Sequence, residues 1–319
     1  MKASYRIESP RGDITPEIRS RLIELTITDE SGGMSDACSL VLSDEPELIE
    51  RPRAGDTLKV ALGYEEVLIE MGRFTLKPIE AKGYPSQLKL TATAIAGAKS
   101  LLSKKERSWN NQSIGDIARE IAAENGLTAA VSSYFDGIKI KHIDQHESDS
   151  SFLSRIAEIY DGVYKPFEDR LILIKKGESE TASGRKIEPI TISRVKDYSL
   201  STSTEKAYTG VKAFYWDERL AERKEVLEGA DESVFEIDFL MTDKAMAKSI
   251  AASKLKKLER ESSRLTLTVT GNQELFAERK AEISGVRPDV DGTWLITKVT
   301  HTLNASGYIS KVELERTSE

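Results

Sequence analysis

The sequence predicts a mainly β protein with an α+β part, in which two copies of one β-domain flank a small α/β module. Three observations support this prediction. Residues 285–315 have the alternation of a long β-hairpin, residues 60–90 repeat its pattern, and two short amphipathic helices stand between the copies. A chain of 319 residues is also too long for one ordinary core and suggests two or three domains.

The hairpin at 285–315 gives the clearest pattern. Gly292 precedes a strand whose apolar residues are Trp294, Ile296 and Val299. A turn from Asn304 to Gly307 then reverses the chain. The return strand carries alternating apolar residues, Tyr308, Val312 and Leu314.

An earlier stretch matches this hairpin in glycine and apolar positions. Gly72, Phe74 and Ile79 match Gly292, Trp294 and Val299, and, after four extra residues in the later copy, Gly83, Tyr84, Leu88 and Leu90 match Gly307, Tyr308, Val312 and Leu314. The preceding strands match at Val60, Leu62 and Gly63 against Ala281, Ile283 and Gly285. Chance likeness between hairpins of similar length is the alternative, but the number of positions in register favours a duplicated domain.

Residues 1–100 form the first predicted domain, and they are all-β. The predicted strands lie within 21–30, 38–49, 50–64, 66–76 and 86–95. Turn residues separate them, among them Pro46, Pro52 and the Gly55–Asp56 pair. Several short strands with such turns are typical of a barrel or a sandwich.

Residues 101–189 form the predicted α/β module and its linker. A polar, basic connection at 97–112 leads to two capped amphipathic helices, 113–127 and 148–162, with Ser113 as a candidate cap of the first. The predicted strands are 127–131, 137–143 and a hairpin at 163–176 that turns at Glu168–Arg170. Residues 177–189 are rich in Gly, Ser and Glu, which is typical of a linker.

Residues 190–319 form the second predicted β-domain, with one long helix. The predicted strands are 190–195, 198–203, 208–216 and 264–271, and a charged stretch at 217–233 is predicted to be a surface excursion. The helix spans 242–262, with Thr242 as its candidate cap. Its buried stripe is predicted to contain Met246, Ile250, Ala251, Leu255 and Leu258.

Composition and charge exclude several classes of protein. The hydrophobic fraction of 39% and the charged fraction of 31% are those of a soluble globular protein. The formal net charge of −7 argues against a duplex nucleic-acid binder, which needs a basic face. Cys38 is the one cysteine, so no intrachain disulfide can form and a buried, inert thiol is expected. No stretch has the apolar length of a membrane span or of a signal peptide, so we expect folding in a cytoplasm.

The sequence contains no recognisable catalytic, cofactor-binding or metal-binding set of residues. His142 and His146 have the spacing of two metal ligands on a helix, but His142 ends a strand-like run, so hydrogen-bonded or solvated histidines are the better interpretation. His301 lies in the last hairpin. There is no G-x-S-x-G, P-loop, G-x-G-x-x-G or C-x-x-C motif. The lysines of the long helix, Lys248, Lys254, Lys256 and Lys257, alternate with Glu259 and Glu261, which is typical of a solvated face.

Several stretches together resemble the late control protein D family, the tail hub proteins of contractile-tailed bacteriophages. The matching stretches are 53–64, 71–83, 151–175 and 285–315, which occur in the family's order and span nearly the whole chain. The resemblance implies two tail-tube-like β-barrels per chain and a ring of three chains. Such a ring would join the hexameric tail tube to the trimeric spike. The hub part of type VI secretion spike proteins is similar.

The resemblance also implies partners and a location. The expected partners are two further copies of the chain, the tube protein, the spike, other baseplate proteins and tape-measure protein, without sequence-specific nucleic acid or membrane insertion. Assembly would take place in the host cytoplasm and the product would sit in the virion baseplate. Since the chain carries no fused lysozyme or spike domain, such functions are expected in separate proteins.

Two other classes of function remain open from the sequence. A cell-wall hydrolase would require a catalytic carboxylate, which no motif identifies. A carbohydrate-binding β-protein would require an exposed aromatic platform, for which Trp216 and Trp294 are the candidates. Trp294 alternates with Ile296 and is expected in the core, so it is the weaker candidate.

Overall fold

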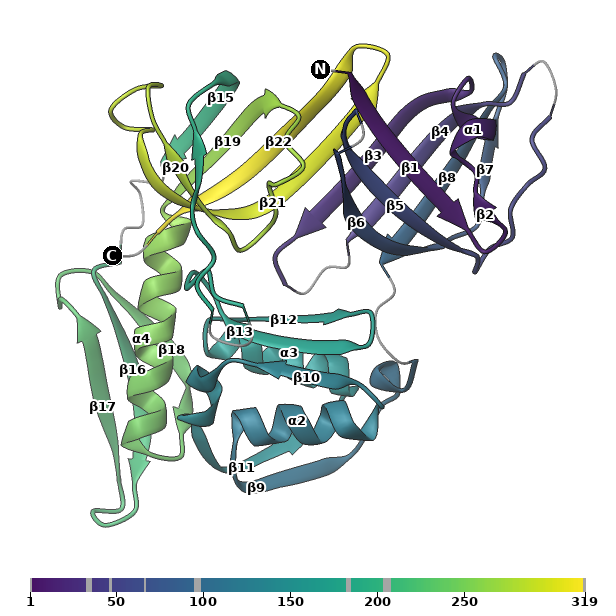
Figure 1. The fold of residues 1–319 in the computed structure, drawn as a ribbon. Coiled ribbons are helices and arrows are strands. Elements are labelled where there is room, and N and C mark those ends of the chain that lie inside the picture. The colour runs from purple at the N-terminus through teal and green to yellow at the C-terminus, as the bar shows by residue number, and fades with distance from the viewer. Residues whose placement is uncertain are drawn as a thin grey trace.

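The computed structural model describes residues 2–32, 36–45, 48–65, 67–94, 99–181, 185–202 and 208–317. Figure 1 shows two strongly curved β-layers side by side, purple and blue for the N-terminal one and yellow-green for the C-terminal one, above a mixed α/β part. We call the layers the first and the second barrel. Pro46, Ser203 and the start of the 97–112 connection lie outside the described residues.

The first barrel contains the strands up to residue 94 and one short helix. Its elements are β1 (Ala3–Ser9), β2 (Gly12–Asp13), α1 (Thr15–Ile18), β3 (Leu22–Glu30), β4 (Ala37–Ser43), β5 (Thr57–Tyr64), β6 (Val67–Leu76), β7 (Glu80–Lys82) and β8 (Gln87–Ala94). Every second side chain along β4 and β8 is buried, as expected for strands with one face toward a core. This core includes Leu25, Phe74 and Leu88. Cys38 belongs to this core, and its burial raises the pKa of the thiol to about 12, as expected for an inert residue.

The second barrel repeats the strand order of the first. Its elements are β14 (Ile190–Ile192), β15 (Val195–Thr202), β19 (Ser263–Thr270), β20 (Lys280–Ile283), β21 (Gly292–Asn304) and β22 (Gly307–Arg316). Pairing runs β15-β19-β22-β21-β20-β14, and the first barrel runs β3-β4-β8-β6-β5-β1 in the same sense. The one difference in direction is at the end, where β14 pairs parallel to β20 but β1 pairs antiparallel to β5.

Irregularities fall at matching places in the two barrels. The register of β3 against β4 shifts between Leu22 and Glu24, and that of β15 against β19 shifts between Val195 and Asp197. Glycines with positive φ also lie at matching places two residues before Phe74 and Trp294, Gly72 within β6 at 126° and Gly292 at the start of β21 at 130°. Bulges and left-handed glycines are specific features of a sheet, so their coincidence supports the duplication.

The strand ladders correct the alignment of the two copies. With Phe74 placed on Trp294, Leu88 falls on the position of Ser310 and Leu58 on that of Ala281. The sequence match had placed Leu88 on Val312, which is two residues away. A shift of two keeps every side chain on its face of the sheet, so apolar alternation alone could not detect it. The long strand β21 is then equivalent to β6 and β7 together.

The middle of the chain forms the expected α/β module. Its elements are η1 (Lys99–Leu102), β9 (Arg107–Ser113), α2 (Ile114–Glu124), β10 (Thr128–Val131), η2 (Ser133–Asp136), β11 (Lys139–Gln145), α3 (Asp149–Ile159), β12 (Gly162–Phe167) and β13 (Arg170–Lys175). Ser113 caps α2 by accepting the backbone N–H of Asp116, and Ser148 caps α3 in the same way. The prediction of a plain connection at 97–112 was wrong, since β9 pairs antiparallel with β11.

A second group of elements shares its hydrophobic core with this module and not with the second barrel. It contains β16 (Gly210–Asp217), β17 (Glu222–Gly229), β18 (Val234–Met241) and α4 (Lys244–Glu261). Val211, Ala213 and Ile250 share one hydrophobic core with Phe152 and Leu171 of the module. The long helix, which the sequence placed in a 190–319 barrel domain, therefore lies outside the barrel in Figure 1.

Three local predictions in this region also differ from the structure. Residues 217–233, expected as a surface excursion, contain β17, which pairs along its whole length with β16. The cap of α4 is Asp243 and not Thr242, since the Asp243 carboxylate accepts the backbone N–H of Met246 at 2.9 Å. Strand β18 was not predicted at all. Its three-stranded sheet gives α4 an apolar surface to cover.

The two tryptophans that the sequence singled out lie in different environments. Trp294 is 1% exposed, and its Nε1–H donates to the carbonyl oxygen of Val290 at 2.8 Å. Trp216 on β16 is 43% exposed. Trp294 therefore belongs to the core of the second barrel, as predicted.

We expect Trp294→Ala to lower the free energy of unfolding by about 3–5 kcal/mol, because it leaves a large cavity and an unpaired carbonyl. Trp216→Ala serves as the matched control and is expected to change it by about 0.5 kcal/mol or less. Urea denaturation followed by far-ultraviolet circular dichroism measures both. Equal effects of the two substitutions would contradict the core assignment of Trp294.

Candidate assembly interface

One antiparallel strand pair joins the two barrels into a continuous sheet. Strand β21 pairs with β3 from Lys298 opposite Glu30 to Asn304 opposite Glu24. Pairing buries Leu25, Ile27 and His301, which are at most 2% exposed. The 14-stranded sheet that results, counted over the described residues, passes through both barrels without a break. We call the β21–β3 pair the barrel junction.

His301 lies at the barrel junction and is neutral there. Its Nε2 lies 3.3 Å from the carbonyl oxygen of Leu275, which can only accept, so Nε2 carries the proton. Its Nδ1 lies 2.9 Å from the hydroxyls of both Ser310 and Tyr308. Burial lowers the pKa of His301 below its ordinary value of 6.5, against the smaller effect of the Leu275 carbonyl. The histidine therefore acts as a hydrogen-bonded core residue.

Asp29 connects all three parts of the molecule. It is the penultimate residue of β3 in the first barrel. Its Oδ2 accepts the backbone N–H of Ala277 from the second barrel at 2.8 Å, and its Oδ1 lies 2.9 Å from Lys165 Nζ of the module. Lys165 also contacts Asp36 Oδ1 at 2.7 Å. Burial opposes ionisation of Asp29, but the Lys165 ammonium and the Ala277 N–H keep its pKa below the ordinary value. Burial and the charge of Asp29 raise the pKa of Asp36 to about 6.

Further polar contacts hold the module against the second barrel. The buried carboxylate of Glu278 accepts the hydroxyl of Ser31 in the first barrel and, at 3.4 Å, the backbone N–H of Gly177 in the linker. Lys176 Nζ lies 3.0 Å from Glu315 Oε2 on β22. Arg260 at the end of α4 makes a buried ion pair with Asp161, which follows α3 by two residues. These contacts fix the position of the module under the barrel junction.

Two edge strands of the continuous sheet, β15 and β7, are open on one side. Among the described strands, β15 pairs with β19 alone and β7 pairs with β8 alone. The two strands lie at opposite sides of the upper layer in Figure 1. Glu80, Ala81 and Lys82 are all exposed, and Tyr198 on β15 is 39% exposed. Each edge therefore presents free backbone donors and acceptors for a further strand.

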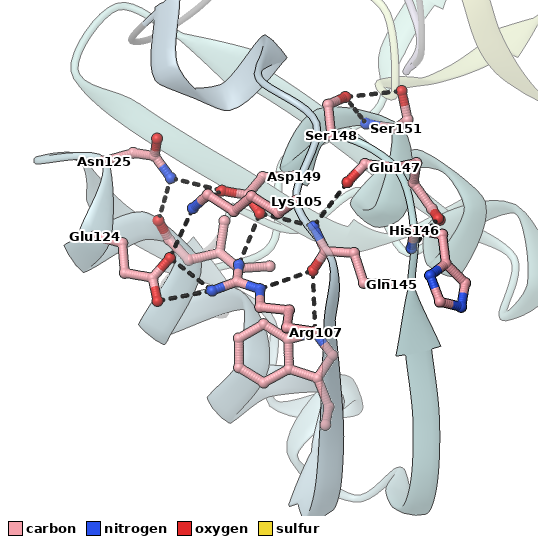
Figure 2. A network of polar contacts seen from close by, with 12 residues as sticks. Lys105, Arg107, Glu124, Asn125, Gln145, His146, Glu147, Ser148, Asp149 and Ser151 are labelled. Carbon is pink, nitrogen blue, oxygen red and sulfur yellow. Dashed lines mark hydrogen bonds and ion pairs between the residues drawn. The ribbon is translucent and has the colours of Figure 1, made fainter.

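A dense polar network inside the module surrounds Asp149, which is fully buried (Figure 2). Its two oxygens accept from Lys105 at 2.7 Å, Arg107 at 2.7 Å, Gln145 at 2.8 Å and Asn125 at 3.0 Å. Burial opposes ionisation, but these donors lower the pKa of Asp149. Four donors satisfy the Asp149 carboxylate, and the network ties β9, α2, β11 and α3 together.

The other polar residues that the sequence singled out lie on the surface. His142 is 53% exposed beside Asp144, and Figure 2 shows the ring of His146 turned away from the Asp149 network. Lys257 lies 3.2 Å from Glu158, and Lys254 stands over the ring of Phe235 at 4.5 Å. Lys248, which lies 4.0 Å from Glu228, Lys254 and Lys257 thus pair with neighbouring groups of this chain.

Within the described part of the chain, no group of three or more His, Cys, Asp or Glu side chains is placed to hold a metal ion. The described helices also include none that is both long and apolar enough to cross a membrane.

Comparison with known proteins agrees with this architecture. The family model described as phage tail baseplate hub (GPD) matches residues 90–307. The chain belongs to this family. The probable baseplate hub protein of Escherichia phage P2 is 31% identical over 98% of this chain and 92% of its own length.

Two solved structures extend the likeness of fold. The 43 kDa tail protein of prophage MuSo2 from Shewanella oneidensis has a TM-score of 0.70 at 14% identity, over 99% of this chain and 98% of its own. An Escherichia coli component of the type VI secretion system has a TM-score of 0.57 at 12% identity, over 100% of this chain and 78% of its own. The recognised resemblance to the hub family and the predicted mainly β class with an α+β part are thereby confirmed.

Sequence reasoning missed the residues that hold the three parts together. Asp29, Lys165 and Glu278 stand in strands or turns where a charged residue is ordinary, and no local pattern distinguishes them. Asp29 and Lys165 are separated by 136 positions. Only the fold brings them into contact.

We expect Lys165→Met to lower the free energy of unfolding by roughly 3 kcal/mol, because Asp29 and Asp36 lose their counter-charge in a largely buried place. Lys139→Met, which removes an exposed lysine of β11, is the matched control. Urea denaturation measures both variants. The assignment fails if they unfold at the same urea concentration.

The pH dependence of stability tests the neutral His301. Because its folded-state pKa lies below 6.5, the unfolded chain takes up a proton that the folded chain resists, so stability falls as the pH drops below 6.5. We expect this acid-side loss to become smaller in His301→Gln and to persist in His142→Gln, a control at an exposed position. Thermal unfolding between about pH 7.5 and pH 5.5 provides the measurement. The raised pKa of Asp36 makes the folded chain take up a proton first, so it increases stability as the pH falls. This contribution is the same in both variants, so the difference between the variants isolates His301.

Proposed function

We propose that this chain is the structural subunit of a tail baseplate hub, in which three copies form a ring that adapts a six-fold tail tube to a three-fold spike. Its action is assembly, and it uses no chemical step. Membership in the baseplate hub family supports the structural role and a place in the tail baseplate of the particle.

The observation that carries the proposal is the duplicated barrel in one continuous sheet. A three-fold ring meets a six-fold ring well only if each subunit offers two nearly equivalent surfaces. The two barrels have the same strand order and the same bulge position, and the barrel junction holds them side by side. Three such chains would present six similar units.

We further propose the partners that this geometry requires. The tube protein would contact one face of the ring and the spike the other, with neighbouring baseplate proteins around it. Strand β6 pairs with β8 as β21 pairs with β22, so a tube subunit would meet a similar surface on each barrel. The ring would be assembled in the cytoplasm of the host.

Solution mass tests the ring. By light scattering on a size-exclusion column, over a dilution series, we expect a mass near three times that of the 35.4 kDa chain. Closed symmetric assembly predicts that no larger species grows with concentration. A chain that stays monomeric at every concentration, also with a candidate spike protein added, would contradict the proposal.

A further inference from the structure

The barrel junction provides a template for a contact between chains. When the two barrels are aligned by their bulges and strand ladders, β15 is equivalent to β3. Tyr198 then corresponds to Leu25, and Leu200 corresponds to Ile27. In the same alignment, β7 is equivalent to the second half of β21, and Ala81 corresponds to His301. The two strands that form the junction thus have their counterparts in the two open edges.

Side chains at the open edges are more exposed than the equivalent side chains at the junction, as expected if the open edges lack a partner strand. At the junction, Leu25 is 0% and His301 is 1% exposed. At the equivalent open positions, Tyr198 is 39% exposed and Ala81 is exposed, although both are residues that a neighbour could cover. Tyr84, just beyond β7, is 97% exposed. Large apolar groups at a free sheet edge indicate a surface that another strand covers.

We infer that β15 of one chain pairs antiparallel with β7 of a second copy, in the register that the barrel junction has within one chain. This inference rests on the proposed ring and specifies its contact. Transferred from the junction, the register places Leu200 opposite Ala81, Ser199 opposite Lys82 and Ser201 opposite Glu80.

The side chains of the two edges suit this pairing. Tyr198 and Leu200 face the core side, where Ala81 and Gly83 are small and leave room for them. On the other face, Lys82 stands diagonal to Asp197, which brings opposite charges together. Identical residues do not face each other, so the contact is head-to-tail. Repeated with a three-fold rotation, it joins the sheets of three chains into a closed ring in which every β15 and β7 edge is covered.

Cysteine pairs test both the contact and its register. The in-register variants are Lys82→Cys with Ser199→Cys and Glu80→Cys with Ser201→Cys. The matched control is Glu80→Cys with Ser199→Cys, which are out of register. Such diagonal neighbours are roughly 7–8 Å apart, beyond the reach of a relaxed disulfide. Since β7 and β15 belong to different barrels and lie at opposite sides of the upper layer in Figure 1, a disulfide between them must join two chains.

Mass by light scattering is measured first on the reduced proteins, and mild oxidation is then followed on a non-reducing gel. We expect trimers in solution, and covalent dimers and trimers at least about 5-fold more abundant in the in-register variants than in the control. Trimers without preferential cross-linking would overturn the β15–β7 contact and leave the hub ring in place. Monomers throughout would overturn the ring and this contact with it. The native Cys38 is buried and does not compete.

Discussion

The backbone pairing of β21 with β3 is the contact on which the rest of the architecture depends. Edge strands carry free donors and acceptors that must find partners, and here each barrel provides the partner for the other. This pairing aligns the two barrels in one sheet and fixes their separation at the spacing of neighbouring strands. The pairing leaves β15 and β7 as open edges at opposite sides of the upper layer (Figure 1).

The polar contacts below the junction determine where the module sits. Asp29 receives one donor from the second barrel and one from the module, so neither part can rotate without leaving its carboxylate unpaired. Such partly buried ion pairs add little net stability, but breaking one is costly. Their effect is therefore to select one arrangement of the three parts. The Arg260–Asp161 pair has the same effect where α4 meets α3.

Strongly periodic elements of this fold were predictable from the sequence, and contacts between distant segments were not. The hairpin of β21 and β22 turns at Asn304 to Gly307 as predicted, because apolar alternation and turn residues agree there. The register between the two copies was wrong by two residues, since period-two alternation cannot distinguish such shifts. The placement of α4 depended on β18, whose pattern of burial is irregular. For the junction residues, the information lies in pairs of residues far apart in the chain.

Placing two barrels in one chain explains the chemical difference between the junction and the open edges. Within a chain the barrels are tethered, so their contact forms at a high effective concentration and can be strongly apolar, as Leu25 and Ile27 are. An edge that meets another chain is exposed to solvent until assembly, and an apolar strand there would attract wrong partners. Charged residues such as Lys82 and Asp197 protect the open edges, while Tyr198 and Leu200 retain apolar area for the correct neighbour. The same strand pairing is thus used within one chain and between chains. The junction strands are apolar because they are covered during folding, and the open edges carry charges because they are covered only on assembly.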